Sequence, residues 1–254
     1  MKVENIVLVI PTYNERENIV RLIEAINTNC RPHAIDPEIF VVDDNSPDGT
    51  ADAAEEMKDR FRVKVLRREG RRGLGLSYRD GFQAVLNTSP AEFIFSMDAD
   101  FSHDPGAIPL LLKKVRDEGW DLAVGSRYIP GGSIPEWGAA RRIISTSCNA
   151  LSRLLLGLRI RDVTTGFRCY RRRVLEALPW KIIRCDGYAF MEEILFYCEK
   201  LGFTIGEVPI TYRERTWGET KLNGLEIVKV FFTLLRLRFT KKDVQRGKVP
   251  LENP

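Results

Sequence analysis

Two aspartates separated by a single residue, Asp98 and Asp100, are the side chains of this sequence best suited to carry chemistry. They follow a short apolar segment, Glu92 to Met97, that is typical of a buried strand in a parallel sheet. Ligands of open α/β sheets bind beyond the carboxyl ends of the strands, where two carboxylates can share a Mg²⁺ or Mn²⁺ ion that in turn holds phosphates. An Asp-X-Asp sequence is also common by chance, and an acid after a strand often only caps the next helix. The pair alone therefore leaves both interpretations open.

Residues that can bind anions occur at two other places. Arg127 follows the apolar segment 122–124, so its guanidinium can fork onto a phosphate at the same edge of the sheet or form a salt bridge to one of the two aspartates. Arg141 and Ser145 are four residues apart and share one face of a predicted helix, for which a solvated arginine face is the alternative. The glycine-rich segment 70–75 matches neither the phosphate-loop nor the dinucleotide-binding pattern and favours a flexible turn lined by its two arginines.

The elements that must position these residues alternate along the chain. Apolar segments of strand type are followed by turn residues and then by helices whose apolar residues recur every three or four positions. This alternation predicts an α/β fold with a doubly wound, mostly parallel sheet flanked by helices. We expect strands at residues 5–10, 39–42, 63–66, 92–97, 122–124 and 204–210, a turn feeding a short strand over 162–170, and helices at 51–59, 76–86, 141–158, 188–200 and 225–239, with a further helix around each of residues 19–26 and 108–115.

The composition limits the class of protein. A chain of 254 residues is long enough for one large α/β domain or two small ones. Its five cysteines are odd in number and form no Cys-X-X-Cys pair, which argues against a disulfide framework or a zinc site and indicates a reducing compartment. The first apolar segment is too short for a signal peptide, and no uncharged apolar run approaches the roughly 20 residues that span a bilayer. We therefore expect neither secretion nor a transmembrane segment.

Positive charge is concentrated near the end of the chain. The net charge is +4, but residues 221–248 carry eight Lys and Arg against two acids, Glu226 and Asp243. Such a basic segment indicates an anionic surface, either nucleic acid or lipid headgroups. The apolar helix predicted at 225–239 includes interleaved basic residues, so it can lie at a bilayer interface or pack against the sheet domain. We expect a catalytic domain at 1–221 and an amphipathic, basic C-terminal helix and tail at 222–254.

Several short motifs occur in register along residues 5–240. They are Pro11-Thr12-Tyr13-Asn14-Glu15, the segment from Val41 to Thr50, Met97-Asp98-Ala99-Asp100, Gly125-Ser126-Arg127-Tyr128, and Arg215-X-X-Gly218-X-X-Lys221. In this order and at these intervals the chain resembles the family 2 glycosyltransferases of the GT-A fold. Within that family the resemblance is to dolichol-phosphate mannose synthases, through the segments Arg141 to Ser145, Thr165 to Arg168 and Gly206 to Ile210.

The resemblance implies transfer of mannose from GDP-mannose to a polyprenyl (dolichyl) phosphate in a membrane, with Mg²⁺ or Mn²⁺ as cofactor. It also implies roles for the matching positions. The guanosine would be held by Pro11, Tyr13, Glu15, Val42 and Asp44, the metal and diphosphate by Asp98, Ala99 and Asp100, the donor phosphates by Arg127, Arg215 and Lys221, and the acceptor phosphate by Arg127, Arg141 and Ser145. Asp98, Asp100, Arg127 and Arg215 would be the catalytic residues. Some relatives have Gln as a further metal ligand where this chain has Ser102, whose hydroxyl is a weaker ligand.

The implied acceptor makes a general base unnecessary. A phosphate monoester with a second pKa near 6 is mostly dianionic at pH 7, so it can attack the sugar directly, and a single displacement inverts the anomeric centre. Glu192 and Glu193 are candidate bases if the acceptor is instead a hydroxyl. The alternatives are a UDP-glucose:polyprenyl phosphate glucosyltransferase and a non-catalytic lipid or nucleic-acid binding module. For the mannosyltransferase we expect no nucleic-acid partner, peripheral association with the cytoplasmic face of a membrane, and room for a separate membrane-anchoring subunit.

Overall fold

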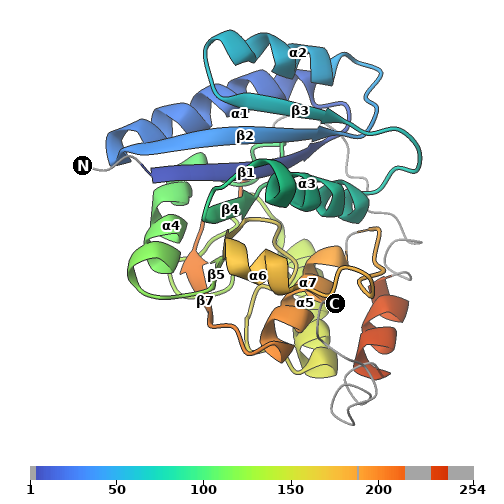
Figure 1. Cartoon of the computed structure of the whole chain (residues 1–254). Coiled ribbons are helices and arrows are strands. Elements are labelled where there is room, and N and C mark those ends of the chain that lie inside the picture. Colours follow the sequence, from blue (N-terminus) through green and yellow to red (C-terminus); the bar gives the residue numbers. More distant parts are fainter. Residues whose placement is uncertain (1–3, 188, 215–229, 240–254) are drawn as a thin grey trace.

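A computed structural model describes residues 4–187, 189–214 and 230–239 of the chain (Figure 1). The described residues form a seven-stranded sheet in the order β3-β2-β1-β4-β6-β5-β7. The strands are β1 (Glu4–Thr12), β2 (Ile35–Asp43), β3 (Val63–Arg67), β4 (Phe93–Ser96), β5 (Leu122–Ser126), β6 (Arg168–Arg171) and β7 (Ile205–Pro209). All pairings are parallel except those of β6, which runs antiparallel to both β4 and β5. The expected mostly parallel α/β sheet is confirmed.

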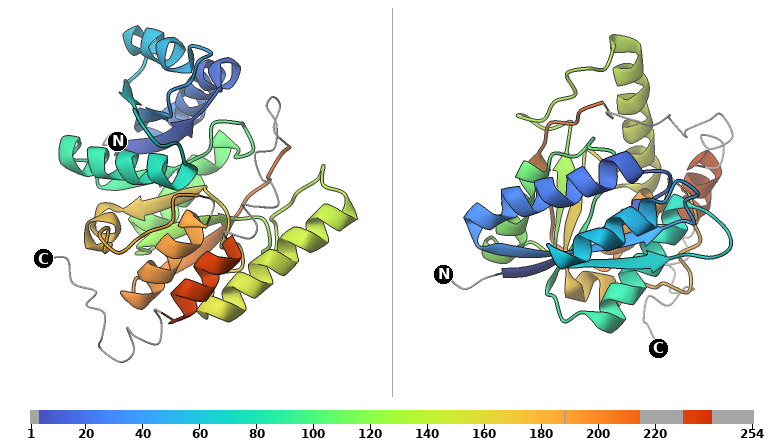
Figure 2. Two further views of the ribbon diagram at one scale, coloured as in Figure 1. Left: turned by 90° about the vertical axis from the view of Figure 1, so that its right-hand side faces the viewer. Right: turned by 90° about the horizontal axis from the view of Figure 1, so that it is seen from above.

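Helices cover both faces of this sheet (Figures 1 and 2). They are α1 (Arg16–Cys30), α2 (Thr50–Glu56), α3 (Leu74–Thr88), α4 (Ile108–Asp117), α5 (Ala139–Leu156), α6 (Arg172–Ala177) and α7 (Phe190–Lys200), with short 3₁₀ turns at Arg31–His33, Met57–Asp59 and Pro105–Ala107. Residues 230–239 are also helical, within the longer helix predicted there. The strand predictions found the right elements but made several of them too short, and α6 had no counterpart in the sequence prediction.

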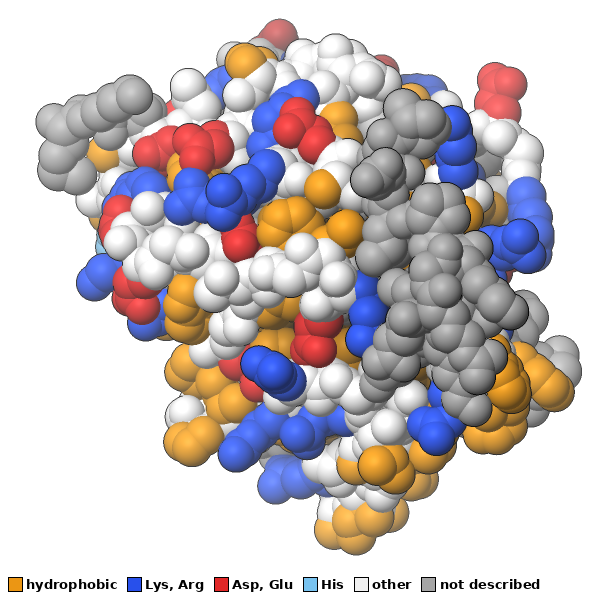
Figure 3. Space-filling model, turned by 60° about the horizontal axis from the view of Figure 1, so that its bottom comes forward, with side chains coloured by type: hydrophobic (Ala, Val, Ile, Leu, Met, Phe, Trp, Pro, Cys, Tyr) orange, Lys and Arg blue, Asp and Glu red, His pale blue; other side chains and the backbone are white. Residues whose placement is uncertain are grey.

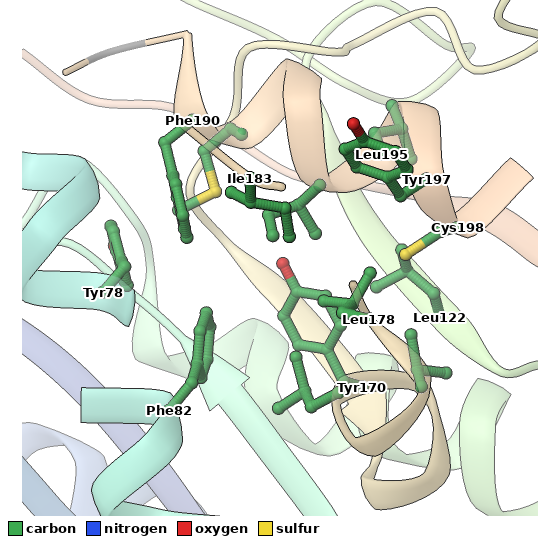
Figure 4. Close-up of a cluster of buried hydrophobic side chains, with 14 of the residues drawn as sticks. Tyr78, Phe82, Leu122, Tyr170, Leu178, Ile183, Phe190, Leu195, Tyr197 and Cys198 are labelled. Carbon is green, nitrogen blue, oxygen red and sulfur yellow. The ribbon is translucent and has the colours of Figure 1, made fainter. Parts of the chain in front are cut away.

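The two faces of the sheet bury separate hydrophobic clusters, which explains the continuous apolar composition of the central strands. Side chains alternate between the faces, so in β1 Ile6 and Leu8 enter one cluster while Val7 and Val9 enter the other. The first cluster lies against α1 and α4, and the second against α3, α7 and the helix at 230–239. Figure 4 shows part of the second cluster, in which aromatic rings of α3, β6 and α7 meet.

The strand order marks the carboxyl ends of the central strands as the place where ligands bind in open α/β proteins. The chain passes from β1 to β2 and β3 on one side and then to β4 on the other, so the order reverses between β1 and β4. A crevice at such a switch point, beyond the carboxyl ends of the strands, is the usual ligand site. Three residues that are not glycine adopt positive φ there, Asn14 after β1, Asn45 after β2 and Phe101 after β4. Backbone strain of this kind gathers at functional sites.

Candidate active site

The turn after β4 presents Asp98 and Asp100 at the carboxyl ends of these strands. Phe101, at φ 61°, reverses the chain directly behind them, and Asp100 Oδ1 accepts a hydrogen bond from the backbone N–H of Ser102 at 3.1 Å. Asp98 Oδ1 accepts a hydrogen bond from the Tyr78 phenol at 2.8 Å, and the Asp98 side chain is 35% exposed. Asp100 is therefore held by a local contact, and Asp98 by a side chain of α3. The strand that the sequence predicted before them is confirmed at Phe93–Ser96.

A buried histidine closes the same turn. The His103 ring stacks on Phe167, with a centroid separation of 5.2 Å, and its Nδ1 accepts a hydrogen bond from the backbone N–H of Asp98 at 3.3 Å. Burial lowers the pKa of His103 and outweighs the opposing effects of Asp98 and Asp100, so the imidazole is neutral. The Ser102 hydroxyl is also buried and lacks a hydrogen-bond partner of normal geometry, with the Tyr212 phenol beside it.

The donor set of this turn fits a hard divalent cation that is shared with a substrate. No three His, Cys, Asp or Glu side chains converge on a metal position in the part of the chain that the structure describes, which excludes a site made by such side chains alone in that part. Mg²⁺ characteristically takes one or two protein carboxylates and completes its shell with water and phosphate oxygens. Asp98 and Asp100 supply that type and number of ligands, and the buried Ser102 hydroxyl belongs to the second residue after Asp100.

Arg127 follows β5 as predicted, but its planar fork binds a carboxylate that the sequence did not indicate. Nε and Nη2 of Arg127 donate to the two oxygens of Asp162 at 2.7 and 2.8 Å, and Nη2 also donates to Thr164 at 2.7 Å. The carboxylate that pairs with Arg127 through this fork is therefore Asp162, and not one of the two aspartates named in the salt-bridge alternative, and this face of the guanidinium is already used. The reason is topological, because antiparallel β6 brings the loop that precedes it back to the end of β5. Burial lowers the pKa of Arg127, but Asp162 outweighs this effect and the net shift is upward.

Two of the residues predicted for an acceptor phosphate, Arg127 and Arg141, lie near the same indole ring. The Arg141 guanidinium lies 4.2 Å from the centroid of the Trp137 ring and pairs with Glu214, while the Arg127 guanidinium lies 5.9 Å from the same ring. Ser145 Oγ lies 2.7 Å from the Tyr128 hydroxyl, at hydrogen-bond distance. The two arginines therefore converge from β5 and α5 as a phosphate site would require. The side chain of Arg141 remains 43% exposed, so it has not become a buried structural group.

The residues predicted for a nucleoside lie after β1 and β2. The Arg72 guanidinium stacks on the Tyr13 ring at 4.3 Å from its centroid and donates to the Tyr13 hydroxyl, which gives the glycine-rich turn a definite position. Asp44 Oδ2 accepts from the backbone N–H of Gly73 at 2.9 Å, and Oδ1 pairs with Arg68. The same turn thus contacts two of the five residues predicted for the nucleoside, Tyr13 and Asp44.

Three other predicted residues of this group have structural roles. The Glu15 N–H donates to Thr50 Oγ1 at 2.9 Å, and its carboxylate accepts from Asn18 at 2.7 Å. Pro11 and Val42 are buried partners in the β1–β2 pairing. Since the Val42 side chain lies in the hydrophobic core, any contact of Val42 with a nucleotide must come from its backbone. Ala99, between the two aspartates, is also buried.

Glu192 and Glu193 are not placed to act as bases on an acceptor. Glu193 is fully buried, and its carboxylate accepts from the backbone N–H of Cys185 at 2.7 Å and from Arg236 at 2.7 Å. Glu192 is 3% exposed, and burial raises its pKa to about 7. Both side chains therefore belong to the interior around α7. Arg215 and Lys221, predicted to bind phosphates, lie outside the described residues.

Sequence reasoning missed the residues that hold the predicted ones in place. Asp162 is far from Arg127 in the sequence, and Tyr78 is one of many aromatic residues of the core, so neither had a local pattern to mark it. Gly166 is different, because it lies in a segment that supported the family resemblance. Its position against Asp98, where a Cβ atom would lie 3.0 Å from Oδ1, gives that segment a physical role.

Comparisons with solved structures agree with the fold. Glucosyl-3-phosphoglycerate synthase from Mycobacterium tuberculosis, in complex with Mn²⁺, uridine diphosphate and glucosyl-3-phosphoglycerate, matches with a TM-score of 0.65 at 21% identity, covering 92% of this chain and 80% of that one. Mannosyl-3-phosphoglycerate synthase from Rubrobacter xylanophilus matches with a TM-score of 0.67 at 18% identity, covering 99% and 78%. At such identities the likeness shows the fold alone, and it confirms the expected GT-A type.

Relatives found by sequence have much higher identities to this chain than these solved structures. The polyprenol monophosphomannose synthase of Mycolicibacterium smegmatis is 41% identical over 227 residues, which are 89% of this chain and 83% of that protein. The undecaprenyl-phosphate mannosyltransferase of Micrococcus luteus is 39% identical over 220 residues, 86% of this chain and 88% of that protein. The model of the family described as "Glycosyl transferase family 2" matches residues 7–178. The resemblance seen in the motifs is therefore confirmed, and the chain belongs to glycosyl transferase family 2.

Proposed function

We propose that this protein transfers mannose from GDP-mannose to the phosphate of a polyprenyl (dolichyl) phosphate, with inversion at the anomeric carbon. The observation that carries the proposal is the position of the Arg127 and Arg141 guanidiniums, 5.9 and 4.2 Å from the centroid of the Trp137 ring, at the end of the strands that also presents Asp98 and Asp100. A pair of carboxylates suited to a metal-bound diphosphate beside a pair of arginines suited to a second phosphate matches a reaction with two phosphorylated substrates. The two mannosyltransferase relatives support the choice of sugar.

The donor would bind across the carboxyl ends of β1, β2 and β4. Tyr13 and Asp44 would contact the guanosine, and Asp98 and Asp100 would hold Mg²⁺ or Mn²⁺ against the diphosphate. When bound, this ion would stabilise the negative charge that develops on the leaving diphosphate. We assign Arg215 and Lys221 to the same diphosphate on the strength of the family motif. Opening of the Arg72–Tyr13 stack would let the base reach the Tyr13 ring.

The acceptor would need orientation but no deprotonation. A phosphate monoester is already ionised at pH 7, and its oxygen is the nucleophile. Arg141 would supply charge and hydrogen bonds from its exposed guanidinium, while Arg127, with its fork on Asp162, would contribute mainly a fixed positive charge. Ser145 would add a hydroxyl from the adjacent turn of α5. The burial of both Glu192 and Glu193 agrees with a mechanism that uses no carboxylate base.

The acceptor lipid lies in a membrane, and one end of the protein has a suitable surface. Ile143, Ile144, Leu151 and Leu154 of α5 are 43–77% exposed, and so are Phe231, Phe232 and Phe239 of the neighbouring helix at 44–64%. Figure 2 shows α5 projecting from the body, with the helix at 230–239 beside it. Figure 3, in which the bottom of the molecule in Figure 1 is turned forward, shows hydrophobic side chains gathered beside Lys and Arg. Arg238 donates to the backbone carbonyl of Leu155 at 3.2 Å, which joins the two helices.

We name these seven exposed apolar residues the apolar platform and propose that it inserts into the interfacial layer of the bilayer. None of the described helices is long and apolar enough to cross a membrane. The inner face of the helix at 230–239 packs Leu234 and Leu237 into the hydrophobic core, as one of the two sequence-based alternatives expects, and we propose the interfacial alternative for its outer face. A separate anchoring subunit, allowed by the family resemblance, has no support in the described residues or the comparisons. We place the reaction at the cytoplasmic face.

The test of the function is a transfer assay with radiolabelled GDP-mannose and radiolabelled UDP-glucose. Purified protein, polyprenyl phosphate in detergent and Mg²⁺ or Mn²⁺ are incubated, and the product is extracted into organic solvent. We expect label in the organic phase only with GDP-mannose, with GDP released in equal amount. Transfer from UDP-glucose instead would favour the glucosyltransferase, and binding of the lipid without any transfer would favour a non-catalytic module.

A further inference from the structure

The Asp98 carboxylate is held by groups that lie outside the motif in which it occurs. Its Oδ1 atom accepts a hydrogen bond from the Tyr78 phenol at 2.8 Å. Its Oδ2 atom lies 3.9 Å from Nδ1 of His103, but that nitrogen already accepts the backbone N–H of Asp98 and so has no proton to donate. One oxygen is therefore engaged by a buried donor, and the other keeps its acceptor capacity.

Tyr78 is rigid because of the core around it. Its side chain is fully buried in α3, and its ring stacks on Phe190 of α7 with a centroid separation of 6.3 Å and an interplanar angle of 2°. It also meets Phe82, one turn further along the helix, with a centroid separation of 5.9 Å (Figure 4). A tyrosine phenol ionises only at about pH 10, so at neutral pH Tyr78 donates its proton to Asp98 Oδ1. The position of this donor is thus set by aromatic packing.

Gly166 closes the other side of the same carboxylate. A Cβ atom at this position would lie 3.0 Å from Oδ1 of Asp98 and 3.2 Å from the Tyr78 hydroxyl. The backbone there cannot retreat easily, because the Gly166 carbonyl accepts a hydrogen bond from the buried Ser96 hydroxyl at 2.6 Å. Any side chain at position 166 would therefore push the carboxylate or break its bond to the phenol.

We propose that Tyr78 and Gly166 are positioning residues that fix Asp98 with Oδ1 on the phenol and Oδ2 turned toward the divalent cation. The inference rests on the metal assignment in the proposed function and extends it to two residues that do not touch the ion. A ligating carboxylate that is itself hydrogen-bonded binds metal more tightly, and the loss of such a supporting group typically costs 10–100-fold in metal affinity. A tyrosine in the hydrophobic core and a glycine in a loop would then strengthen metal binding, although neither touches the ion.

The experiment measures Mn²⁺ binding directly. The full chain is titrated with Mn²⁺ in the presence of GDP, and free Mn²⁺ is followed by electron paramagnetic resonance. We expect Tyr78→Phe to raise the Kd for Mn²⁺ at least tenfold, and Gly166→Ala to raise it as well. The Mn²⁺ concentration for half-maximal transfer should rise with it, while the KM for polyprenyl phosphate stays within twofold.

Two variants serve as matched controls. Tyr170→Phe removes another buried phenol, whose oxygen has no hydrogen-bond partner of normal geometry, and Gly138→Ala adds a Cβ atom where nothing lies within 4 Å. Both should bind Mn²⁺ as the wild type does. Thermal melting of every variant separates a local loss of metal affinity from unfolding, and the Kd is compared only among proteins that are folded at the temperature of the titration.

The outcomes separate this inference from the function on which it rests. If Asp98→Asn abolishes Mn²⁺ binding but folded Tyr78→Phe binds Mn²⁺ like the wild type, the positioning role is refuted and the metal assignment stands. If the wild type with GDP binds no Mn²⁺, the metal assignment fails, and the positioning role that rests on it fails as well. A Kd for Tyr78→Phe that rises no more than that of Tyr170→Phe also refutes it.

Discussion

Arg127 and Asp162 form a buried bidentate ion pair that ties the end of β5 to the loop before β6. Asp162 is fully buried, and it accepts from the backbone N–H of Arg127 at 2.9 Å in addition to the two bonds of the guanidinium fork. Its own N–H donates to Glu207 at 3.0 Å, which ties the same loop to β7. The pair therefore fixes both the charge near the acceptor site and the loop that carries Gly166.

Removal of one partner of this pair should strongly destabilise the protein. We expect Asp162→Ala to lower the free energy of unfolding by about 3–5 kcal/mol, because it leaves the Arg127 charge buried without a counterion. Urea unfolding followed by circular dichroism measures the change. The control is Glu24→Ala, which removes the partner of Arg60 in an exposed pair and should cost under about 1 kcal/mol. Equal losses of unfolding free energy in the two variants would show that the buried pair contributes no more to stability than an exposed pair.

The aspartate pair makes a second prediction. Asp100→Ala should lower kcat for mannosyl transfer by about 10²–10³-fold, the usual effect of losing a group that stabilises developing charge, and leave the fold intact. The transfer assay and a melting curve check both parts, with Asp117→Ala, which removes an exposed carboxylate of α4, as the control. Unchanged turnover of Asp100→Ala at saturating Mg²⁺ or Mn²⁺ would contradict the metal assignment.

Arg141 should affect the acceptor more than the donor. Because its guanidinium is exposed beside Trp137, we expect Arg141→Ala to raise the KM for polyprenyl phosphate about tenfold, as for loss of a charge-assisted bond, while the Kd of GDP-mannose stays unchanged. Steady-state kinetics and calorimetry with GDP-mannose measure the two quantities. Arg141→Lys keeps the charge without the fork and should recover part of the loss. Weaker donor binding with normal acceptor use would mean that Arg141 has the opposite role.

The sequence predicted those parts of the site that depend on neighbours in the chain. Asp98 and Asp100 were recognisable because a buried strand must end just before them, and the edge they occupy follows from the alternation of strands and helices. The partner of Arg127 was not recognisable, because it depends on the antiparallel direction of β6, which no local pattern encodes. Tyr78 was missed for a similar reason, since its function depends on which face of α3 packs against the sheet.

The raised pKa of the buried Glu192 carboxyl gives a prediction for how stability depends on pH. Burial raises the pKa of Glu192 to about 7 from 4.5, with a smaller contribution of the same sign from Asp162 and opposing ones from the Glu192 backbone and Arg168. The folded state thus binds more protons than the unfolded state between pH 4.5 and 7, so this group makes the protein less stable as pH rises through that range. The full decrease in the free energy of unfolding, on the order of 3 kcal/mol, is present above pH 7.

Glu192→Gln removes this ionisation and keeps the shape of the side chain. We therefore expect the loss of unfolding free energy between pH 5 and pH 8 to be smaller in Glu192→Gln than in the wild type, as measured by urea unfolding at both values. Glu17→Gln, at an exposed position of α1, should leave the difference between the two pH values unchanged. The same pH dependence in Glu192→Gln and the wild type would show that this carboxyl does not titrate in that range.

The apolar platform gives the last prediction, which concerns the membrane. Leu154 is 77% exposed on α5, and its transfer into the interfacial layer should contribute about 1.5–3 kcal/mol to binding. Leu154→Glu removes that contribution and adds the cost of placing a charge near acyl chains, so its partition onto vesicles of neutral and anionic phospholipid should fall at least tenfold. Sedimentation with the vesicles measures the partition.

The matched control is Leu110→Glu, which changes an exposed leucine of α4 that is not part of the platform and should sediment like the wild type. Transfer to a short, water-soluble polyprenyl phosphate should be normal in both variants, because neither residue contacts the groups assigned to the phosphates. Equal loss of vesicle binding in both variants would indicate a general effect of added negative charge. Normal binding by Leu154→Glu would mean that α5 is not the surface that meets the membrane.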